Sequence, residues 1–405
     1  MIRSSKHSIK FANTGKLDMY AEFLKEYRKV FQLVVDHIWV NGYDDFNIDG
    51  ERLNLPMYLD YKRFGIVTNL SARVLRCLVT QASSVIRGTC EKRKKQLYAL
   101  VKYGKKIKLH KISKPICIVN PELNSICCDI QKGQGFDYFA QLKSLGKSYG
   151  KIRIPIKHTK VSRKWEGELM ASVSFSDNNV VLRWKIEKKV KIGKSIGVDQ
   201  GIRNVATLSD GQRTPEKDNH GHSLNSILDK LMRKKKGGKA FKRTCAHRKN
   251  FINWSINQLN LHGHIKLEKL YRVKKGNRKL SHWSYPLIKD KIARRCEELG
   301  VQFSEQSSAY RSQRCNRCGL VRKANRKGAI YKCGCGYIGD SDLNASLNHV
   351  IDLPEMPFDL RSSKLNQKGF HWLPNGFFLD GKELTVPRPE NKKDIKVFTV
   401  IKDNV

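Results

Sequence analysis

The sequence predicts an α+β protein of several domains, in which helices and an antiparallel β-barrel are followed by an α/β domain with a group of four cysteines. Three observations predict this order. Two long stretches near the N-terminus have apolar residues at helical spacing, and a run of short alternating strands follows them. The second half combines apolar strands that end in carboxylates with two close pairs of cysteines. A length of 405 residues fits two or three domains.

The first helical stretch begins near Asn13 or Thr14, either of which can cap a helix after an opening strand predicted at residues 8–11. Its apolar stripe, which we interpret as core, contains Tyr20, Phe23, Leu24, Tyr27, Val30, Phe31, Val34, Val35 and Ile38. A second helix is predicted from about residue 70 to 97. Its inward positions include Val74, Leu78 and Ile86, whereas basic residues such as Arg73 and Arg76 are predicted to face solvent.

Short strands are predicted at residues 106–109, 151–156, 170–175 and 180–184, and their spacing is typical of an antiparallel barrel. Between two of these strands lies a basic loop that also carries His158 and Trp165. We expect Lys157, Lys160 and Arg163 to hold an RNA backbone while the aromatic side chain stacks on a base. A solvated loop with no such role remains an open alternative.

Three carboxylates occupy comparable places in the second half. Asp199 ends an apolar strand at residues 194–198, Glu268 follows the alternating Ile265 and Leu267, and Asp342 lies at or just before the start of a helix-like run. Two hard divalent cations about 4 Å apart can clamp the oxygens of a phosphodiester, and their ligands are oxygen atoms. Each carboxylate alone would be an ordinary turn or surface residue. Asp340 competes with Asp342 for the third position.

The cysteines indicate a metal site. Cys315 and Cys318 are separated by two residues, fourteen residues follow, and Cys333 and Cys335 are separated by one. Four thiolates match a tetrahedral structural zinc site. The second pair is tighter than a Cys-x-x-Cys pair, and we expect Gly334 and Gly336 to allow it. A metal-free remnant or a redox pair would be the alternative; the redox hypothesis is the weaker one.

The charge favours a polyanionic partner. The chain holds 79 Lys and Arg against 37 Asp and Glu, a net charge of +42, and its isoelectric point is about 9.9. Such a field attracts nucleic acid and makes affinity strongly salt-dependent. A ribosomal or membrane-surface protein could share this charge but would not need three spaced carboxylates. The densest basic run is expected to border a nucleic-acid channel, or else to be a solvated segment; it includes Lys234, Lys235, Lys236, Lys239, Lys242 and Arg243.

The sequence has no run of about 20 apolar residues and begins with a strand pattern rather than a signal peptide. We therefore expect an intracellular protein with no membrane partner. The seven cysteines outside the two pairs are expected to be reduced.

Several motifs together carry a resemblance to a known family. In order, they are Gly197-Val198-Asp199-x-Gly201, Leu267-Glu268-x-Leu270, Tyr310-Arg311-Ser312-Gln313-x-Cys315-x-x-Cys318-Gly319, Cys335-Gly336-Tyr337 and Asp342-x-Asn344-Ala345. This order resembles the RuvC-like nuclease half of the transposon-encoded TnpB family. The smallest type V CRISPR effectors, which descend from that family, look similar. The resemblance covers about residues 194–348 closely and the N-terminal half more loosely.

The resemblance implies an RNase H-like (RuvC) fold and an RNA-guided, metal-dependent DNA endonuclease. It implies Asp199, Glu268 and Asp342 as ligands of two magnesium ions, since the family places the third acid two residues before the asparagine. The domain plan that follows is a wedge-like barrel of residues 1–12 and 105–190, a helical recognition lobe of 13–104, a RuvC-like domain of 191–307 and 338–350, a zinc-finger insertion of 308–337, and a C-terminal extension of 351–405.

The implied partners are a guide RNA and a DNA target, double-stranded and single-stranded, with a short adjacent motif read by the N-terminal half. The family resemblance also implies that the basic residues of the predicted second helix, such as Arg73 and Arg76, contact nucleic acid. The implied location is the cytoplasm of a prokaryote, in association with the nucleoid. Two alternatives remain open: a guided DNA-binding repressor that does not cut, and an unguided RNA-binding or RNA-processing protein with a zinc knuckle. Transposon or CRISPR context, monomer or dimer, and the role of residues 351–405, which could wrap the nuclease domain, bind RNA or be partly disordered, are undetermined by the sequence.

Overall fold

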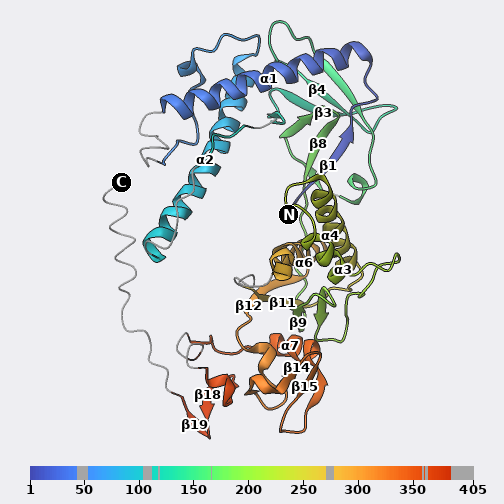
Figure 1. Cartoon of the computed structure of the whole chain (residues 1–405). Helices are drawn as coiled ribbons and strands as arrows, with labels where there is room; N and C mark the ends of the chain where they lie inside the picture. The colour runs from blue at the N-terminus through green and yellow to red at the C-terminus, as the bar shows by residue number, and fades with distance from the viewer. Residues whose placement is uncertain are drawn as a thin grey trace. The chain divides into compact units, whose positions relative to one another are not determined.

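The protein is described from a computed structural model that covers residues 1–42, 53–103, 112–116, 119–165, 167–270, 278–357, 360 and 364–384. The chain divides into two compact units between Glu187 and Lys188 (Figure 1). Among the described helices, none is long and apolar enough to cross a membrane.

The first unit combines two long helices with two antiparallel sheets. The helices are α1 (Thr14–Asn41) and α2 (Ala72–Tyr103), with a short 3₁₀ helix η1 (Tyr61–Phe64) before α2. One sheet has the order β1-β8-β7-β2, with β6 paired to β8, and consists of β1 (Ile2–Ser8), β2 (Glu122–Leu123), β6 (Glu168–Leu169), β7 (Val173–Ser176) and β8 (Asn179–Lys185). The other consists of β3 (Cys128–Lys132), β4 (Tyr138–Leu142) and β5 (Ile152–Ile156).

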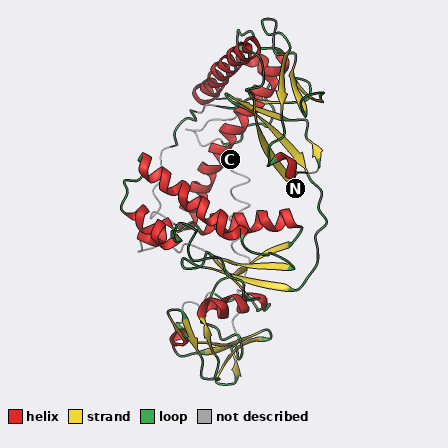
Figure 2. Cartoon of the chain, turned by 90° about the vertical axis from the view of Figure 1, so that its right-hand side faces the viewer, coloured by secondary structure: helices red, strands yellow, loops and turns green. Residues whose placement is uncertain are grey.

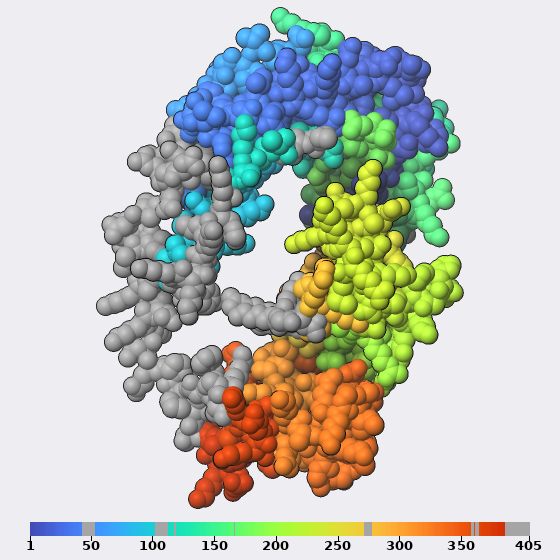
Figure 3. All heavy atoms as spheres, in the orientation of Figure 1, coloured from blue at the N-terminus to red at the C-terminus, as the bar shows by residue number. Residues whose placement is uncertain are grey.

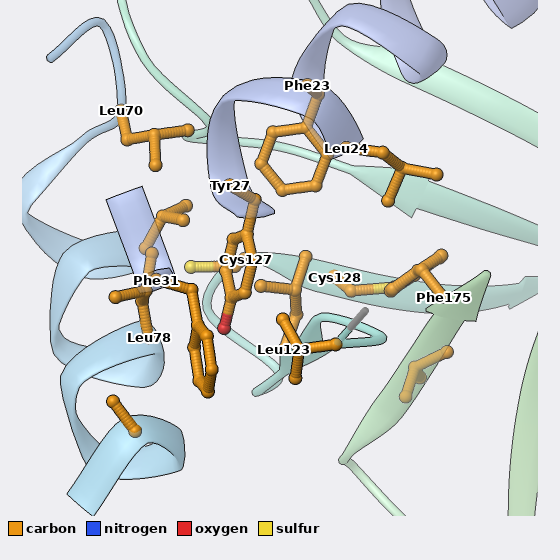
Figure 4. Packing of buried hydrophobic residues seen from close by; sticks show 14 of the residues in the cluster. Phe23, Leu24, Tyr27, Phe31, Leu70, Leu78, Leu123, Cys127, Cys128 and Phe175 are labelled. Carbon is orange, nitrogen blue, oxygen red and sulfur yellow. The ribbon is translucent and has the colours of Figure 1, made fainter. Parts of the chain in front are cut away.

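Helix α1 forms as its sequence predicts. The Asn13 side chain caps it by accepting the backbone N–H of Lys16 at 3.1 Å. All nine residues of the predicted apolar stripe are buried. Figure 4 shows Phe23, Tyr27 and Phe31 of this stripe packed with residues of α2 and of the sheets, among them Leu78, Leu123 and Phe175. The predicted second helix is also present and extends to Tyr103.

The prediction of an opening strand at residues 8–11 was wrong, because the first strand, β1, spans Ile2–Ser8. Its inward positions include the buried polar residues Ser5 and His7, which disguise the alternation. Ser5 Oγ hydrogen-bonds His7 Nε2 at 2.7 Å and accepts the Trp184 indole N–H at 2.9 Å. These polar groups are therefore satisfied within the core.

The strands predicted at residues 151–156 and 180–184 are confirmed as β5 and β8. The strand predicted at 170–175 is confirmed only in its second half, as β7, and the separate strand β6 precedes the predicted segment. The strand predicted at 106–109 lies outside the described residues. The described strands of this unit pair as two sheets, and the closed barrel stays a prediction.

The second unit is built on a mixed sheet with the order β10-β9-β11-β12. Strand β9 (Ser195–Gln200) is parallel to β11 (His264–Lys269), which is parallel to β12 (Gln302–Ser307), and β10 (Ala206–Leu208) is antiparallel to β9. Helix α7 (Ser341–Val350) lies on one side of this sheet, and the other helices lie on the opposite side (Figures 1 and 2). These are α3 (Leu224–Met232), α4 (Lys239–Asn257), α5 (Arg278–His282) and α6 (Tyr285–Leu299).

A small cysteine module precedes α7. It contains the 3₁₀ helices η4 (Arg311–Gln313) and η5 (Lys323–Asn325), strand β13 (Leu320–Val321), and a sheet of β14 (Arg326–Lys327), β15 (Ile330–Lys332) and β16 (Ile338–Asp340). The described part of the C-terminal extension pairs with this module. It contributes η6 (Leu365–Gln367), β17 (Phe370–Leu373), β18 (Gly376–Leu379) and β19 (Lys382–Glu383), in a sheet of order β13-β17-β18-β19.

The contact between the module and the extension is a packed core. Trp372 is 1% exposed and stacks on Phe377, and Arg314 donates to the Trp372 carbonyl at 2.7 Å. Residues 364–384 are therefore part of the folded second unit. The strand predicted at 397–401 lies outside the described residues.

Candidate functional site

Two of the predicted carboxylates lie on neighbouring parallel strands. Asp199 is near the end of β9 and Glu268 near the end of β11, and their exposed fractions are 8% and 7%. The Gln200 backbone N–H donates to Glu268 Oε1 at 2.8 Å, and the Gln200 side-chain amide donates to the Glu268 carbonyl at 3.3 Å. The Glu268 carboxylate is thus held in place from the adjacent strand.

Helix α7 comes very close to β9 because residue 197 is glycine. A Cβ atom added at Gly197 would lie 1.9 Å from the Ser346 carbonyl oxygen and 2.9 Å from the His349 Cβ. The glycine of the Gly-Val-Asp motif therefore serves packing: it lets the helix cross the strand directly beside Asp199.

Arginine and asparagine side chains fix the C-terminal half of α7. Arg314 donates to Asn348 Oδ1 at 2.6 Å, and Arg311 donates to the Ile351 carbonyl at 2.9 Å. Asn344, the asparagine of the Asp-x-Asn motif, donates to the Arg314 carbonyl at 2.8 Å. This asparagine consequently links the helix to the cysteine module.

A histidine that the sequence analysis missed completes the inner group. Donor atoms of Asp199, Glu268 and His349 all lie within 4.8 Å of one another. His349 is 1% exposed, and its Nδ1 has no hydrogen-bond partner among the described residues. It lies seven residues after Asp342, two turns along one helix face, and this spacing was the available signal.

Asp342 lies in the first turn of α7, and its carboxylate pairs with Arg326 of β14 at 3.0 Å. Asp340, the competing residue, is the N-cap: its Oδ1 accepts the backbone N–H groups of Asp342 and Leu343 at 3.0 and 2.9 Å, and it also pairs with Arg213 at 3.2 Å. Because Asp340 is committed to capping, Asp342 is the better candidate ligand. Arg326 is a second residue that the sequence analysis did not find.

Burial and mutual repulsion disfavour ionisation of the carboxyl groups. Burial raises the pKa of Asp199 well above its ordinary value, and the charges of Glu268 and Asp342 act in the same direction. Burial also raises the pKa of Glu268 to about 7, although the Gln200 N–H and the charge of Arg326 oppose the shift. A divalent cation would supply the positive charge that these oxygens lack, so the donor set fits a hard metal ion.

The four predicted cysteines come together in the small module. Cys315 and Cys335 Sγ lie 3.7 Å apart, and Cys318 and Cys333 Sγ lie 3.6 Å apart. Four thiolates at about 2.3 Å from a tetrahedral zinc are about 3.8 Å from one another, so the arrangement fits a four-cysteine metal site. Of the two predicted glycines, Gly336 has the special conformation: its φ of +86° closes a turn in which its N–H donates to the Cys333 carbonyl at 3.1 Å.

The basic residues predicted to contact nucleic acid are mostly exposed. In the first unit these are Arg73, Arg76, Lys157, Lys160 and Arg163; in the second they are Lys235, Lys236, Lys239, Lys242 and Arg243, with Lys234 half-buried. Lys239, Lys242 and Arg243 belong to the first turns of α4 rather than to a flexible segment. Helix α4 belongs to the yellow-green to yellow part of the chain in Figure 3.

The aromatic residues of the basic loop already have partners. Lys164 lies over the Trp165 ring at 4.7 Å and Arg3 at 5.9 Å, while Lys157 lies over the Phe11 and Phe136 rings at 5.3 and 5.4 Å. Base stacking on Trp165 would therefore compete with Lys164 for a face of the ring.

Comparisons with known proteins support a relationship to compact type V CRISPR effectors. Residues 285–349 match the family model "Cas12f1-like, TNB domain". The chain is 39% identical over 92 residues to a "CRISPR-associated endodeoxyribonuclease Cas12f1" of Sulfoacidibacillus thermotolerans and 29% identical over 136 residues to one of Syntrophomonas palmitatica. These alignments span 22% and 32% of this chain and only 22% and 27% of the curated relatives.

Two solved structures share the fold at low sequence identity. One is titled "Cryo-EM structure of the Cas12f1-sgRNA-target DNA complex", with a TM-score of 0.51, 14% identity, and coverage of 84% of this chain and 83% of that one. The other, "Structure of the mini-RNA-guided endonuclease CRISPR-Cas_phi3", has a TM-score of 0.52, 11% identity and coverage of 88% and 94%. The predicted α+β multidomain fold agrees with these similarities, whereas the link to TnpB itself stays a prediction.

Proposed function

We propose that this protein is an RNA-guided, magnesium-dependent DNA endonuclease that binds a guide RNA, recognises a short motif beside its target and hydrolyses DNA phosphodiester bonds. One observation carries the proposal. Asp199 and Glu268 are buried on adjacent strands, and their donor atoms lie within 4.8 Å of that of His349 on α7. The same helix carries Asp342, whose charge raises the pKa of Asp199. This helix lies in the segment that is similar to the Cas12f1-like domain. Both curated relatives are named endodeoxyribonucleases.

The residues that would hold two magnesium ions are Asp199, Glu268 and Asp342. Bound there, the ions would stabilise the attacking and leaving oxygens of the phosphodiester, as in other two-metal nucleases. The chain's own groups prepare the site: the Gln200 N–H orients Glu268, and Gly197 admits α7. Arg326, which pairs with Asp342, would bind a phosphate once cations neutralise the carboxylates.

The other parts have supporting roles in this proposal. Zinc on Cys315, Cys318, Cys333 and Cys335 would hold the module that carries Arg326 and orders the start of α7. The first unit would supply the wedge-like barrel and the recognition lobe, and the second the RuvC-like domain. Exposed Lys and Arg on both would bind RNA and DNA backbones and make affinity fall steeply with salt.

Two other functions compete. A guided DNA-binding repressor would not need the carboxylates, and all three are present in this chain. An unguided RNA-binding or RNA-processing protein would use the basic surfaces and the cysteine module without cutting DNA.

The decisive experiment begins with purification of the protein from cells that carry its native locus, followed by sequencing of the RNA that co-purifies. We expect one dominant RNA with a constant scaffold joined to a variable segment. A segment that matches the flank of a transposable element would indicate a TnpB-like role, and a spacer-derived segment a CRISPR role. Heterogeneous RNA would contradict guided function.

The purified complex is then incubated with magnesium and DNA that carries the matching target beside a randomised motif. Cleavage beside a restricted set of motifs supports the endonuclease. Specific binding without cleavage would favour the repressor, and RNA binding without target recognition would favour the unguided protein.

A further inference from the structure

The second unit contains another cluster of metal-binding side chains, separate from the carboxylates and the cysteines. Asp218 and His222 lie in the loop between β10 and α3, and His247 lies on α4. One donor atom from each of the three lies within 4.8 Å of the others. The sequence alone does not reveal this group, because the three residues come from two separate segments.

In this loop one carboxylate oxygen of Asp218 accepts backbone hydrogen bonds, and the other faces the two histidines. Asp218 Oδ1 accepts the backbone N–H groups of His220 and His222, both at 2.9 Å. The Asp218 N–H donates to the His222 carbonyl at 2.9 Å, and Gly221, with a φ of +75°, closes the turn. Asp218 Oδ2 then lies 3.4 Å from His222 Nδ1 and 4.0 Å from His247 Nε2.

Hydrogen bonding accounts for only part of this arrangement. Asp218 Oδ2 can pair with His222 Nδ1 at 3.4 Å, but its distance of 4.0 Å from His247 Nε2 is too long for a hydrogen bond. The two imidazole rings lie edge to face with centroids 4.8 Å apart, so both approach the same carboxylate oxygen.

The spacing suits an ion between the three groups. Nitrogen and oxygen ligands at about 2.0–2.1 Å from a tetrahedral metal lie about 3.4 Å from one another. The 3.4 Å between Asp218 Oδ2 and His222 Nδ1 matches this value. The 4.0 Å from Asp218 Oδ2 to His247 Nε2 is longer by about 0.6 Å, so His247 would have to move toward the other two donors to become the third ligand.

We propose that Asp218, His222 and His247 form a binding site for a divalent transition metal, with Zn²⁺ as the best-suited ion. Two imidazoles and one carboxylate favour zinc over magnesium, whose ligands are mainly oxygen atoms. The three side chains are 18%, 36% and 35% exposed, so the group lies near the protein surface. The metal would tie the loop before α3 to α4, whose first turns carry the basic residues Lys239, Lys242 and Arg243.

The test measures the number of zinc ions per chain in the full-length protein after dialysis against zinc at low micromolar concentration. Mass spectrometry gives the zinc concentration, which is divided by the protein concentration. We expect His247→Gln and His222→Gln each to lose one zinc per chain relative to the wild type. His220→Gln is the matched control: His220 lies in the same loop but outside the group, and this variant should keep the wild-type zinc content.

A second variant separates this site from the cysteines. Cys318→Ser should lose one zinc per chain. The double variant Cys318→Ser with His247→Gln should lose one more, because the two sites bind zinc independently. Circular dichroism and a melting curve establish that each protein is folded. Equal zinc content in the wild type, His222→Gln and His247→Gln would overturn the proposal, as would loss of zinc in His220→Gln alone. These readouts do not depend on guide RNA or on DNA cleavage.

Discussion

The backbone N–H of Gln200 donates to Glu268 Oε1 at 2.8 Å and thereby joins β9 to β11 where the buried carboxylates meet. A backbone donor cannot rotate away as a side chain can, so the orientation of Glu268 is set by strand pairing itself. The arrangement resembles a prepared ligand set: the acidic groups are buried and held before any cation arrives. Five predictions test this picture and the packing around it.

Substituting Asp199→Asn or Glu268→Gln should reduce magnesium-dependent DNA cleavage by about 1000-fold or more, because the ligands act as a unit on the same ions. Guide RNA binding should change by less than about twofold. Cleavage of labelled target DNA and gel-shift titration of the RNA measure the two properties. Asp210→Asn, in the turn after β10, is the control and should cut normally; unchanged cleavage in Asp199→Asn would remove the proposed function.

His349 should matter for metal use although the sequence motif does not include it. We expect His349→Ala to raise the magnesium concentration needed for half-maximal cleavage by about 10–100-fold. The comparison is His262→Ala, an exposed histidine on the loop before β11. If both variants show the wild-type magnesium dependence, His349 is only a packing residue.

Without metal, the buried acids should make stability fall as pH rises. Folding raises the pKa of Glu268 from 4.5 to about 7, mainly by burial, so the folded chain holds this proton more tightly than the unfolded chain does. The resulting stabilisation is present below about pH 4.5 and is lost as pH rises through about 7. The melting temperature of the wild type in EDTA should therefore drop relative to that of Glu268→Gln between pH 5 and about 7.5. The comparison with this variant is needed because burial lowers the pKa of His349 to about 3, which makes stability rise with pH over part of the same range.

Glu268→Gln is the control for that titration and should flatten the drop, since an amide does not ionise. Magnesium should restore stability most strongly above pH 7, where the carboxylates are ionised. A wild-type pH profile that coincides with that of Glu268→Gln would contradict the burial effect.

Gly197→Ala should destabilise the second unit by about 1–3 kcal/mol or more, because its Cβ would meet the Ser346 carbonyl at 1.9 Å. Chemical denaturation followed by fluorescence measures the change. Gly88→Ala on α2, where nothing lies within 4 Å of the added atom, should be neutral or stabilise by up to about 1 kcal/mol. Similar stabilities for the two variants would mean that α7 does not pack on β9 as described.

Removal of one thiolate should unfold the cysteine module locally. Cys333→Ser is expected to release zinc and to increase amide hydrogen exchange in residues 311–340, because a structural zinc stabilises such small modules. Cys245→Ser, on α4 and outside the group, should retain both zinc and protection. Normal protection in zinc-free Cys333→Ser would show that the module folds without metal.

Local patterns predicted much of this protein correctly. The stripe on α1 and its Asn13 cap follow from residue spacing and from capping chemistry, both of which act within one or two turns. Asp199 and Glu268 were recognisable because each ends an apolar strand within a short motif. The prediction failed at β1, where buried Ser5 and His7 satisfy each other and break the expected alternation.

The sequence by itself determined the types of most elements, the cationic character, and the three carboxylates and four cysteines that could bind metal. Only the tertiary structure brought His349 to Asp199 and Glu268, placed Arg326 on Asp342, paired β13 with β17, and joined Asp218 to His247. The reason is physical: periodicity and capping depend on neighbours a few residues apart. A set of metal ligands depends instead on which distant segments lie together at a sheet edge or on a helix face. Burial of apolar residues and close approach at residues such as Gly197 determine which segments lie together.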